Sequence, residues 1–266
     1  MQYLFSKEGN DALGFLKNNR ANLYAFDFDG TLTGIFRRPM DALLSDSTRH
    51  ALEQLAKAAS VAVVSGRALS SLQTLVPTEG IWLVGNHGIE GMHWDPEFVG
   101  RIREITNGWS KILTNSDWAG RDTNHCELED KIFTLSLHYR NALNPEAARQ
   151  AIFDFIPRLQ PAPRTVFGKY VINLVPPQAP DKGQAILEMM KLSHSTQALY
   201  VGDDCTDEDV FRLGQSSILT VRIGQDPESQ ARFYLKTQTE MDLLLECLLR
   251  QSNSAELPLA GSINKS

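Results

Sequence analysis

The stretch LYAFDFDGTLT, residues 23–33, decides the fold: an apolar run ends abruptly in two carboxylates, a glycine and two hydroxyl side chains. Residues 23–28 form a nearly continuous apolar run, which is typical of a strand buried on both faces of a parallel sheet. Open parallel sheets place their chemistry at the carboxyl ends of their strands, so Asp27 and Asp29 lie where a site is expected. Gly30 can adopt a positive φ and predicts a sharp turn after the strand.

Two carboxylates held this close cannot both stay ionised cheaply unless a cation lies between them or one keeps its proton. Either arrangement is useful, because one carboxylate can act as a nucleophile and metal ligand while the other serves as a general acid and base. The alternative is a strand end capped by solvated acids. The apolar character of the preceding strand argues against that alternative.

Composition bounds the class of protein. The chain has 266 residues, of which 42% are hydrophobic and 22% charged, as in ordinary globular domains with real cores. A net charge of −6 without a basic run argues against a nucleic-acid surface. The three cysteines lie far apart and fit a reducing cytoplasm. With no signal-peptide core and no membrane-length apolar run, we expect a cytoplasmic protein without nucleic-acid or membrane partners.

Strands and helices alternate through the first part of the chain. The expected strands are 22–28, 61–64 and 81–84, with helices after Ser45 and over 68–75. The same pattern returns from Asp181, with a strand at 198–201, a helix at 207–213, strands near 217–223 and 231–235, and a helix at 239–250. These spacings predict a parallel sheet with crossover helices.

The middle of the chain has a different pattern. A helix near 97–115, a strand at 132–139, a helix at 145–156 and strands at 164–167 and 170–175 predict a small antiparallel sheet open on one face. We therefore predict an α/β core, residues 1–104 and 176–252, with an α+β cap inserted at 105–175. We expect hinges near 104–106 and at Pro176 and Pro177. Residues 253–266 are polar without periodicity and predict a disordered tail.

Two further segments carry groups that suit a phosphoryl oxygen. Ser65-Gly66-Arg67 follows a predicted strand and offers a hydroxyl group together with backbone N–H groups. Lys182 opens a helix, where a cation is unfavourable for the helix dipole, so we expect it to have an anionic partner. Taken alone, the first segment is also a common turn and the second a common surface lysine.

The segment GDDCTDED, residues 202–209, crowds acids at another strand end. Carboxylates this close repel one another unless a hard cation is bound, and Mg²⁺ prefers oxygen ligands and several waters. Helix capping by Thr206 and the acids after it is the alternative, and both can hold. We expect Glu208 and Asp209 to be surface acids that interact favourably with the helix dipole.

The first motif resembles DxDGT of the haloacid dehalogenase superfamily of phosphohydrolases, and the other segments follow in that superfamily's order. The resemblance implies a Rossmann-like core with an inserted cap and Mg²⁺-dependent hydrolysis through an aspartyl-phosphate. It makes Asp27 the nucleophile and Asp29 the general acid and base. Ser65 and Lys182 would hold the phosphoryl group. The implied metal ligands are Asp27, Asp203 and the main-chain carbonyl of Asp29, with Asp204 and Asp207 as anchors.

Residues 22–245 also resemble trehalose-6-phosphate phosphatases. The segments that match are GNHGIE (85–90), EDK (129–131), HYRN (138–141) and GKYV (168–171). A sugar phosphate is then the implied substrate and trehalose biosynthesis the implied role, in a protein that we expect to be a monomer. The implied substrate-binding residues are Arg67, Asn86, His87, Glu129, Lys131, His138, Arg140, Lys169 and Asn173.

The sequence departs from that family at one strand. After G-K-x-V the family continues with a glutamate and then a basic residue before proline, whereas this chain has Asn173 and Val175. Another sugar phosphate, such as sucrose 6-phosphate or a glycosylglycerate phosphate, is therefore an alternative substrate. Transfer of the phosphoryl group to another acceptor and a silent sugar-phosphate-binding relative are further alternatives.

Overall fold

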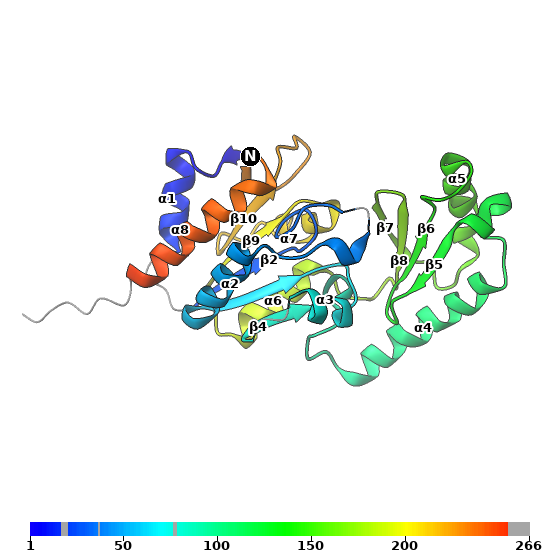
Figure 1. Ribbon diagram of the computed structural model, residues 1–266. Helices are drawn as coiled ribbons and strands as arrows, with labels where there is room; N and C mark the ends of the chain where they lie inside the picture. The colour runs from blue at the N-terminus through cyan, green and yellow to red at the C-terminus, as the bar shows by residue number, and fades with distance from the viewer. Residues whose placement is uncertain (17–20, 37, 77–78, 255–266) are drawn as a thin grey trace, which may run out of the picture.

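The computed structural model describes residues 1–16, 21–36, 38–76 and 79–254 (Figure 1). The expected disordered tail falls mostly on residues 255–266, which lie outside the described residues. Its first two residues, 253 and 254, instead belong to the last helix, α8 (Met241–Ser254). Within the described ranges no helix is both long and apolar enough to cross a membrane.

The core is a seven-stranded sheet in which every neighbouring pair is parallel. Its order is β1-β11-β10-β9-β2-β3-β4, so β2 lies between β9 and β3, and the short edge strand β1 was not predicted. The parallel sheet is otherwise as predicted. The strands are β1 (Gln2–Tyr3), β2 (Asn22–Phe26), β3 (Ser60–Val64), β4 (Ile81–Val84), β9 (Gln197–Gly202), β10 (Ile218–Ile223) and β11 (Phe233–Leu235).

Alternate side chains of β2 pack into two separate cores, one on each face of the sheet. Tyr24 and Phe26 pack in the core formed with α1 (Lys7–Phe15), α2 (Asp46–Ala58), α3 (Leu69–Leu75) and α8. Leu23 and Ala25 pack in the core formed with α6 (Lys182–Leu192) and α7 (Glu208–Phe211). With both faces covered, the strand must be apolar throughout, which explains the continuous run that ends at Asp27.

The inserted part forms a separate antiparallel sheet in the order β5-β6-β8-β7. One face packs on two helices, through a buried core that includes Leu137, Ile172 and Trp109. In Figure 1 one of these helices lies on the outer side of the sheet, away from the core, and the other runs outward along the cap from the junction with the core. The elements are α4 (Pro96–Thr114), β5 (Glu127–Asp130), β6 (Leu135–His138), α5 (Pro145–Phe155), β7 (Arg164–Gly168) and β8 (Val171–Val175).

The strand expected at 132–139 was wrong in extent. Two strands, β5 and β6, pair antiparallel on either side of a turn at Lys131–Thr134. Ile132 has a φ of +73° there, and its backbone N–H donates to Asp130 Oδ1 at 2.8 Å. The β-prone composition of Ile132-Phe133-Thr134 concealed this turn, which depends on the carboxylate of Asp130.

The hinge expected near 104–106 was also wrong, because those residues lie inside the continuous helix α4. Ile102 of this helix packs with Val175 and Ala179 at the junction, while Trp109 packs in the cap. We therefore propose that the domain boundaries lie in the connections before α4 and after β8. Asp95 caps α4, accepting a hydrogen bond from the N–H of Phe98 at 2.9 Å.

Candidate active site

Asp27 stands at the carboxyl end of the central strand β2 and is almost fully buried. Its backbone N–H donates to the carbonyl of Val201 on β9 at 2.8 Å, so the strand pairing fixes its position. Lys182, the first residue of α6, donates from Nζ to Asp27 Oδ1 at 2.7 Å. The structure therefore gives Lys182 the anionic partner that its place at a helix N-terminus predicts.

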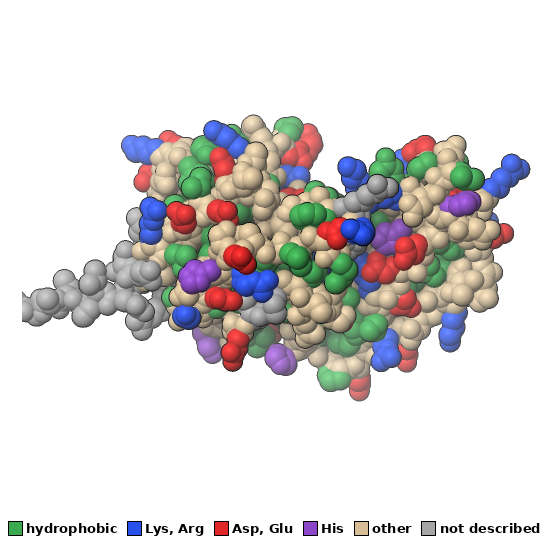
Figure 2. Space-filling view, viewed as in Figure 1, with side chains coloured by type: hydrophobic (Ala, Val, Ile, Leu, Met, Phe, Trp, Pro, Cys, Tyr) green, Lys and Arg blue, Asp and Glu red, His purple; other side chains and the backbone are tan. Residues whose placement is uncertain are grey.

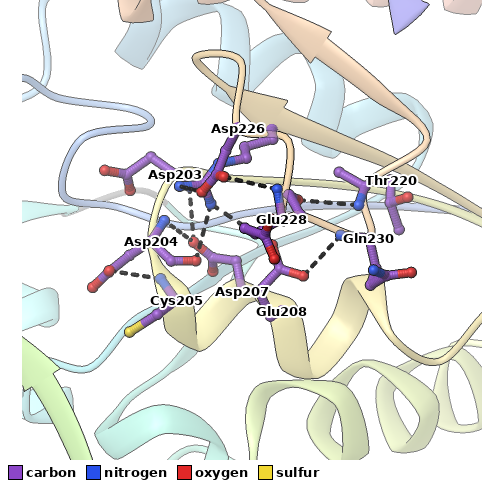
Figure 3. A network of polar contacts seen from close by, with 12 residues as sticks. Asp203, Asp204, Cys205, Asp207, Glu208, Thr220, Asp226, Glu228 and Gln230 are labelled. Carbon is purple, nitrogen blue, oxygen red and sulfur yellow. Dashed lines mark hydrogen bonds and ion pairs between the residues drawn. The ribbon is translucent and has the colours of Figure 1, made fainter. Parts of the chain in front are cut away.

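Asp207 anchors the acidic segment and is completely buried (Figure 3). Its Oδ1 accepts from Lys182 Nζ at 2.7 Å and from the Tyr200 hydroxyl at 2.6 Å. Its Oδ2 accepts from the backbone N–H groups of Asp203 and Asp204 at 2.8 and 2.9 Å. Both oxygens thus already accept hydrogen bonds within the protein. Asp207 is therefore better suited to hold neighbouring groups in place than to bind a metal ion directly.

Tyr200 was missed by the sequence analysis. It lies on the central strand β9 and is fully buried. Burial raises the pKa of its hydroxyl group, and the charge of Asp207 raises it further. A tyrosine within an otherwise aliphatic central strand signals a buried partner for its hydroxyl, although not which residue supplies it.

The acids create a strongly negative site. Burial raises the pKa of Asp27 well above its ordinary value, Lys182 opposes the shift, and Asp207 and Asp203 add to it. Burial, followed by Asp207 and Asp204, raises the pKa of Asp203 to about 7. Although burial lowers it, the pKa of Lys182 is raised well above its ordinary value by Asp207 and Asp27. One lysine thus faces three acids.

A hard divalent cation fits this donor set. Oxygen atoms of Asp27, Asp203 and Asp207 lie within 4.8 Å of one another. Among the described residues, the side chain of Asp203 has one hydrogen bond, a long one in which Thr31 Oγ1 donates to its Oδ1 at 3.4 Å. Oxygen ligands with an excess of negative charge are the chemistry that Mg²⁺ prefers. Asp204 points elsewhere, since its Oδ1 accepts from the N–H of Cys205 at 2.6 Å, and its side chain is exposed.

Gly30 makes this approach possible. Its φ is +85°, and a Cβ atom at this position would lie 2.1 Å from Asp203 Oδ2. The glycine of the first motif therefore provides both the turn and the space for the acid of the fourth motif.

Asp29 is paired differently from Asp27. Arg67 donates from Nε to Asp29 Oδ2 at 2.6 Å and from Nη2 to Asp29 Oδ1 at 2.5 Å, a bidentate arrangement. The guanidinium also lies over the Phe28 ring, 5.3 Å from its centroid. Arg67, predicted to bind substrate, is thus held beside the predicted general acid and base, at the edge of the core that faces the cap.

Ser65 lies buried at the end of β3, and its Oγ accepts from the N–H of Arg67 at 3.2 Å. The next residue has no room for a side chain, because a Cβ at Gly66 would lie 2.4 Å from His87 Cε1. Burial, then Lys182, Lys131 and Arg164, lowers the pKa of His87 well below its ordinary value. His87 is therefore a neutral, buried imidazole packed directly behind the Ser65 turn.

Asn86 holds the core to the cap rather than pointing at a ligand. Its Oδ1 accepts from Thr134 Oγ1 at 2.6 Å, and its Nδ2 donates to the Lys131 carbonyl at 3.0 Å. The same Nδ2 donates to Glu90 Oε2 at 2.6 Å. Both amide hydrogens are engaged and the residue is fully buried, so substrate binding by Asn86 stays a prediction that this geometry does not favour.

Replacing Asn86 tests this clasp. We expect Asn86→Ala to lower the free energy of unfolding by about 2–3 kcal/mol, because it leaves buried groups on both domains without partners. Urea unfolding, followed by circular dichroism, measures the change, with the exposed Asn107→Ala as the control. Equal stability of the two variants would show that the clasp does not hold the domains together.

The open face of the cap sheet carries three of the predicted sugar-binding residues. His138 Nε2 lies 2.8 Å from Glu129 Oε2, and Lys131 Nζ lies 3.8 Å from the same oxygen. Lys131 also reaches the core, donating from Nζ to the Gly66 carbonyl at 3.4 Å. The hydrogen bond with His138 lowers the pKa of Glu129, and burial lowers that of Lys131. Figure 2 shows charged side chains of both signs beside the notch between the two lobes.

The other predicted cap residues do not contact this cluster directly. Asn173 is nearly buried within the sheet, where its Oδ1 accepts from Ser136 Oγ at 2.6 Å and its Nδ2 donates to the Val166 carbonyl at 3.2 Å. Arg140 donates to the Lys169 carbonyl at 3.3 Å. Both Arg140 and Lys169 are exposed beside the turn between β7 and β8.

The expectation that Glu208 is a surface acid was wrong. Its side chain is 8% exposed, and its Oε2 accepts from the N–H of Gln230 at 3.0 Å (Figure 3). Arg222 lies 3.8 Å from its other oxygen. Glu208 therefore ties the loop before β11 to α7, a long-range contact that helix-capping rules do not contain.

A model of the trehalose-phosphatase family matches residues 25–238, a range that includes the four core segments and the cap. The chain belongs to the trehalose-phosphatase family. A trehalose-phosphate phosphatase of Mycobacterium bovis is 32% identical to it over 248 residues, 87% of this chain. The chain spans 62% of that relative's length and 15% of the length of another mycobacterial relative.

Solved structures agree with the fold. The C-terminal domain of Candida albicans trehalose-6-phosphate phosphatase matches with a TM-score of 0.66 and 20% identity, over 92% of this chain and 96% of that one. A haloacid dehalogenase-like hydrolase from Bacteroides thetaiotaomicron matches with a TM-score of 0.57 and 17% identity, over 86% and 98%. The fold of this family member is therefore of the haloacid dehalogenase type, as predicted.

Proposed function

We propose that this protein is a phosphatase that hydrolyses trehalose 6-phosphate to trehalose and phosphate. The observation that carries the proposal is the buried pair of Asp27 and Lys182 at the end of the central strand, beneath a polar cap face. Membership of the trehalose-phosphatase family supports the same reaction. The proposed ligand is a small sugar phosphate, and a monomeric state and a cytoplasmic location stay predictions.

In the proposed mechanism Asp27 attacks phosphorus and becomes an aspartyl-phosphate, while the sugar leaves as an alcohol. Asp29 gives its proton to the leaving oxygen of the sugar. It then takes a proton from the water that attacks the aspartyl-phosphate, which releases phosphate and restores the carboxylate of Asp27. Arg67 orients Asp29 through the bidentate contact. Lys182 and the Ser65 turn stabilise the phosphoryl oxygens.

Asp27, Asp203 and the main-chain carbonyl of Asp29 would hold Mg²⁺, with Asp207 and Asp204 as anchors. The bound cation would neutralise charge on the phosphoryl group, which is its usual contribution to phosphoryl transfer. Asp207 keeps Lys182 and the backbone of Asp203 in place, so that the ligand acid stays oriented when the substrate enters.

The sugar would contact the open face of the cap. Glu129, His138 and Lys131 already form a connected set there, and a disaccharide offers many hydroxyl groups to satisfy them. Such a site discriminates between sugars, because closure over a wrong sugar would leave these partly shielded polar groups without partners.

A second candidate reaction is hydrolysis of another sugar phosphate. The neutral Asn173 is directed into the sheet by Ser136 and Val166, where a glutamate would present a charged acceptor. This observation favours a pocket in which Glu129 supplies the carboxylate on the cap face and Asn173 supplies a neutral amide. The substrate comparison at the end of the Discussion separates the two reactions.

Metal removal tests the proposed chemistry. We expect EDTA to lower phosphate release from trehalose 6-phosphate by about 100-fold or more, since a divalent cation contributes several kcal/mol to charge stabilisation. Excess Mg²⁺ should restore the rate. Excess Ca²⁺ should not, because Ca²⁺ takes more ligands at longer distances. Full turnover in EDTA would rule out the proposed metal dependence.

A further inference from the structure

Arg164 lies at one edge of the cap sheet. It is the first residue of β7 and pairs with Val175, the last residue of β8. Directly paired residues of antiparallel strands carry their side chains on the same face, with Cβ atoms about 4.5–5.5 Å apart. The positive charge of Arg164 thus stands on the same face and at the same edge of the sheet as Val175.

That edge is the part of the cap sheet closest to the core. Glu129, Ser136, Asn173 and Val166 form one row across the sheet, and Lys131 and Arg164 each lie two residues further toward the core. Val175, between them, packs with core-side Ile89 and Ala179. The two cations therefore stand at opposite ends of one row.

Each of these cations contacts a different part of the core. Lys131 reaches the Ser65 turn through the Gly66 carbonyl, at 3.4 Å. Arg164 Nη1 lies 3.8 Å from Oδ2 of Asp209, the last residue of the acidic segment, on α7. On the same side, Cys205 Sγ donates to the Phe167 carbonyl at 3.5 Å. The cap therefore touches both sides of the site.

The environment of Arg164 gives this contact its importance. The side chains of Arg164 and Asp209 are 33% and 23% exposed, so the pair is partly shielded from water. A cation in such a place needs a charged partner, and the pair is worth more than a pair on the open surface. Gly183 holds α7 close to Lys182, since its Cβ would lie 2.4 Å from the Asp209 carbonyl. Asp209 is thus fixed relative to the reacting groups.

We propose that Arg164 is a positioning residue that holds the cap over Asp27 through its contact with Asp209. It does not touch the reacting atoms; it sets where Glu129, Asn173 and Lys131 lie above them. The inference rests on the proposed function for its kinetic test, but not for its structural one. It also corrects the expectation that Asp209 is merely a surface acid.

The kinetic test is a double-mutant cycle with trehalose 6-phosphate. We expect Arg164→Gln and Asp209→Asn each to lower kcat/KM about tenfold, and the double variant to lose no more than the worse single variant. Arg149→Gln, which removes an exposed arginine of the same cap paired with Glu146, is the control. Losses that multiply in the double variant would contradict the proposed contact.

An exchange variant separates positioning from general damage. Arg164→Val combined with Val175→Arg moves the guanidinium to β8 on the same face. We expect this double variant to recover most of the kcat/KM that Arg164→Gln loses. Arg164→Lys should fall between the wild type and Arg164→Gln. An exchange variant that folds but stays as impaired as Arg164→Gln would overturn the proposal.

Amide hydrogen exchange tests the contact without any substrate. We expect Arg164→Gln and Asp209→Asn to speed exchange in β7 and in residues 205–209 together, while Arg149→Gln leaves both unchanged. If trehalose 6-phosphate is not a substrate but exchange changes this way, the proposed function fails and the contact stands. Unchanged exchange in both segments would show that Arg164 does not hold the cap.

Discussion

Asp27→Asn is expected to abolish phosphate release while leaving the protein folded. The amide of this variant would lack the anionic oxygen that attacks phosphorus, so we expect kcat to fall by about 10⁴-fold or more. An amide oxygen can still accept the hydrogen bond from Lys182, and Asp207 continues to pair with that lysine. Steady-state phosphate release and intact-protein mass spectrometry during turnover measure the effect.

The same variant makes an opposite prediction for stability. Asp27 is buried among other acids, and burial with Asp207 and Asp203 raises its pKa. Removing this charge should therefore leave the free energy of unfolding equal to or above that of the wild type. Asp154→Asn, on the exposed side of α5, is the control and should keep full activity. Substantial turnover by Asp27→Asn would exclude Asp27 as the nucleophile.

Lys182→Met is expected to destabilise the protein more than any other single change considered. It removes a cation that contacts both Asp27 and Asp207, two carboxylates that are buried in the centre of the molecule. Breaking a buried ion pair by removing one partner costs about 3–5 kcal/mol, because the remaining charge is uncompensated. Urea unfolding in metal-free buffer measures the loss, and turnover should disappear as well.

Two further variants show whether the loss comes from the buried charges. Lys191→Met changes the 76% exposed lysine of the same helix and should alter stability by less than about 0.5 kcal/mol. Adding Asp27→Asn to Lys182→Met removes one orphaned carboxylate and should recover part of the lost stability. If Lys182→Met unfolds like Lys191→Met, the ion network is not what holds the site together.

Local sequence signals predict the core of this protein well, and there is a physical reason. The central strands β2, β3 and β9 are buried on both faces, so their apolar runs are nearly continuous and their ends are marked by a turn or a polar residue. The carboxyl ends of parallel strands meet at one edge, which brings Asp27, Ser65 and Asp203 together without any knowledge of long-range contacts.

The cap was predicted less accurately because its strands are only four or five residues long and carry buried polar residues such as Ser136 and Asn173. The turn at Ile132 depends on a side-chain contact of Asp130, and α4 crosses the expected domain boundary because its two ends pack against different cores. Neither feature can be predicted from the local conformational preferences of the residues.

Partners across the chain were the hardest to predict. Tyr200, Arg164 and Thr134 each acquire their role from a residue on another element or loop, brought close only by the fold. The charge and spacing of the residues next to them along the chain do not indicate these roles. Asn86 was predicted to bind substrate, whereas the structure places its side chain between the core and the cap, against partners that only the fold could reveal.

The central claim is best tested by comparing kcat/KM for trehalose 6-phosphate with that for glucose 6-phosphate, sucrose 6-phosphate and a glycosylglycerate phosphate, all with Mg²⁺. The account predicts a preference for trehalose 6-phosphate of about 100-fold or more, because the correct sugar alone satisfies Glu129, Lys131 and His138, which are partly shielded from water. Equal turnover of all four, or a preference for another of them, would contradict the proposed substrate while leaving the chemistry of Asp27 intact.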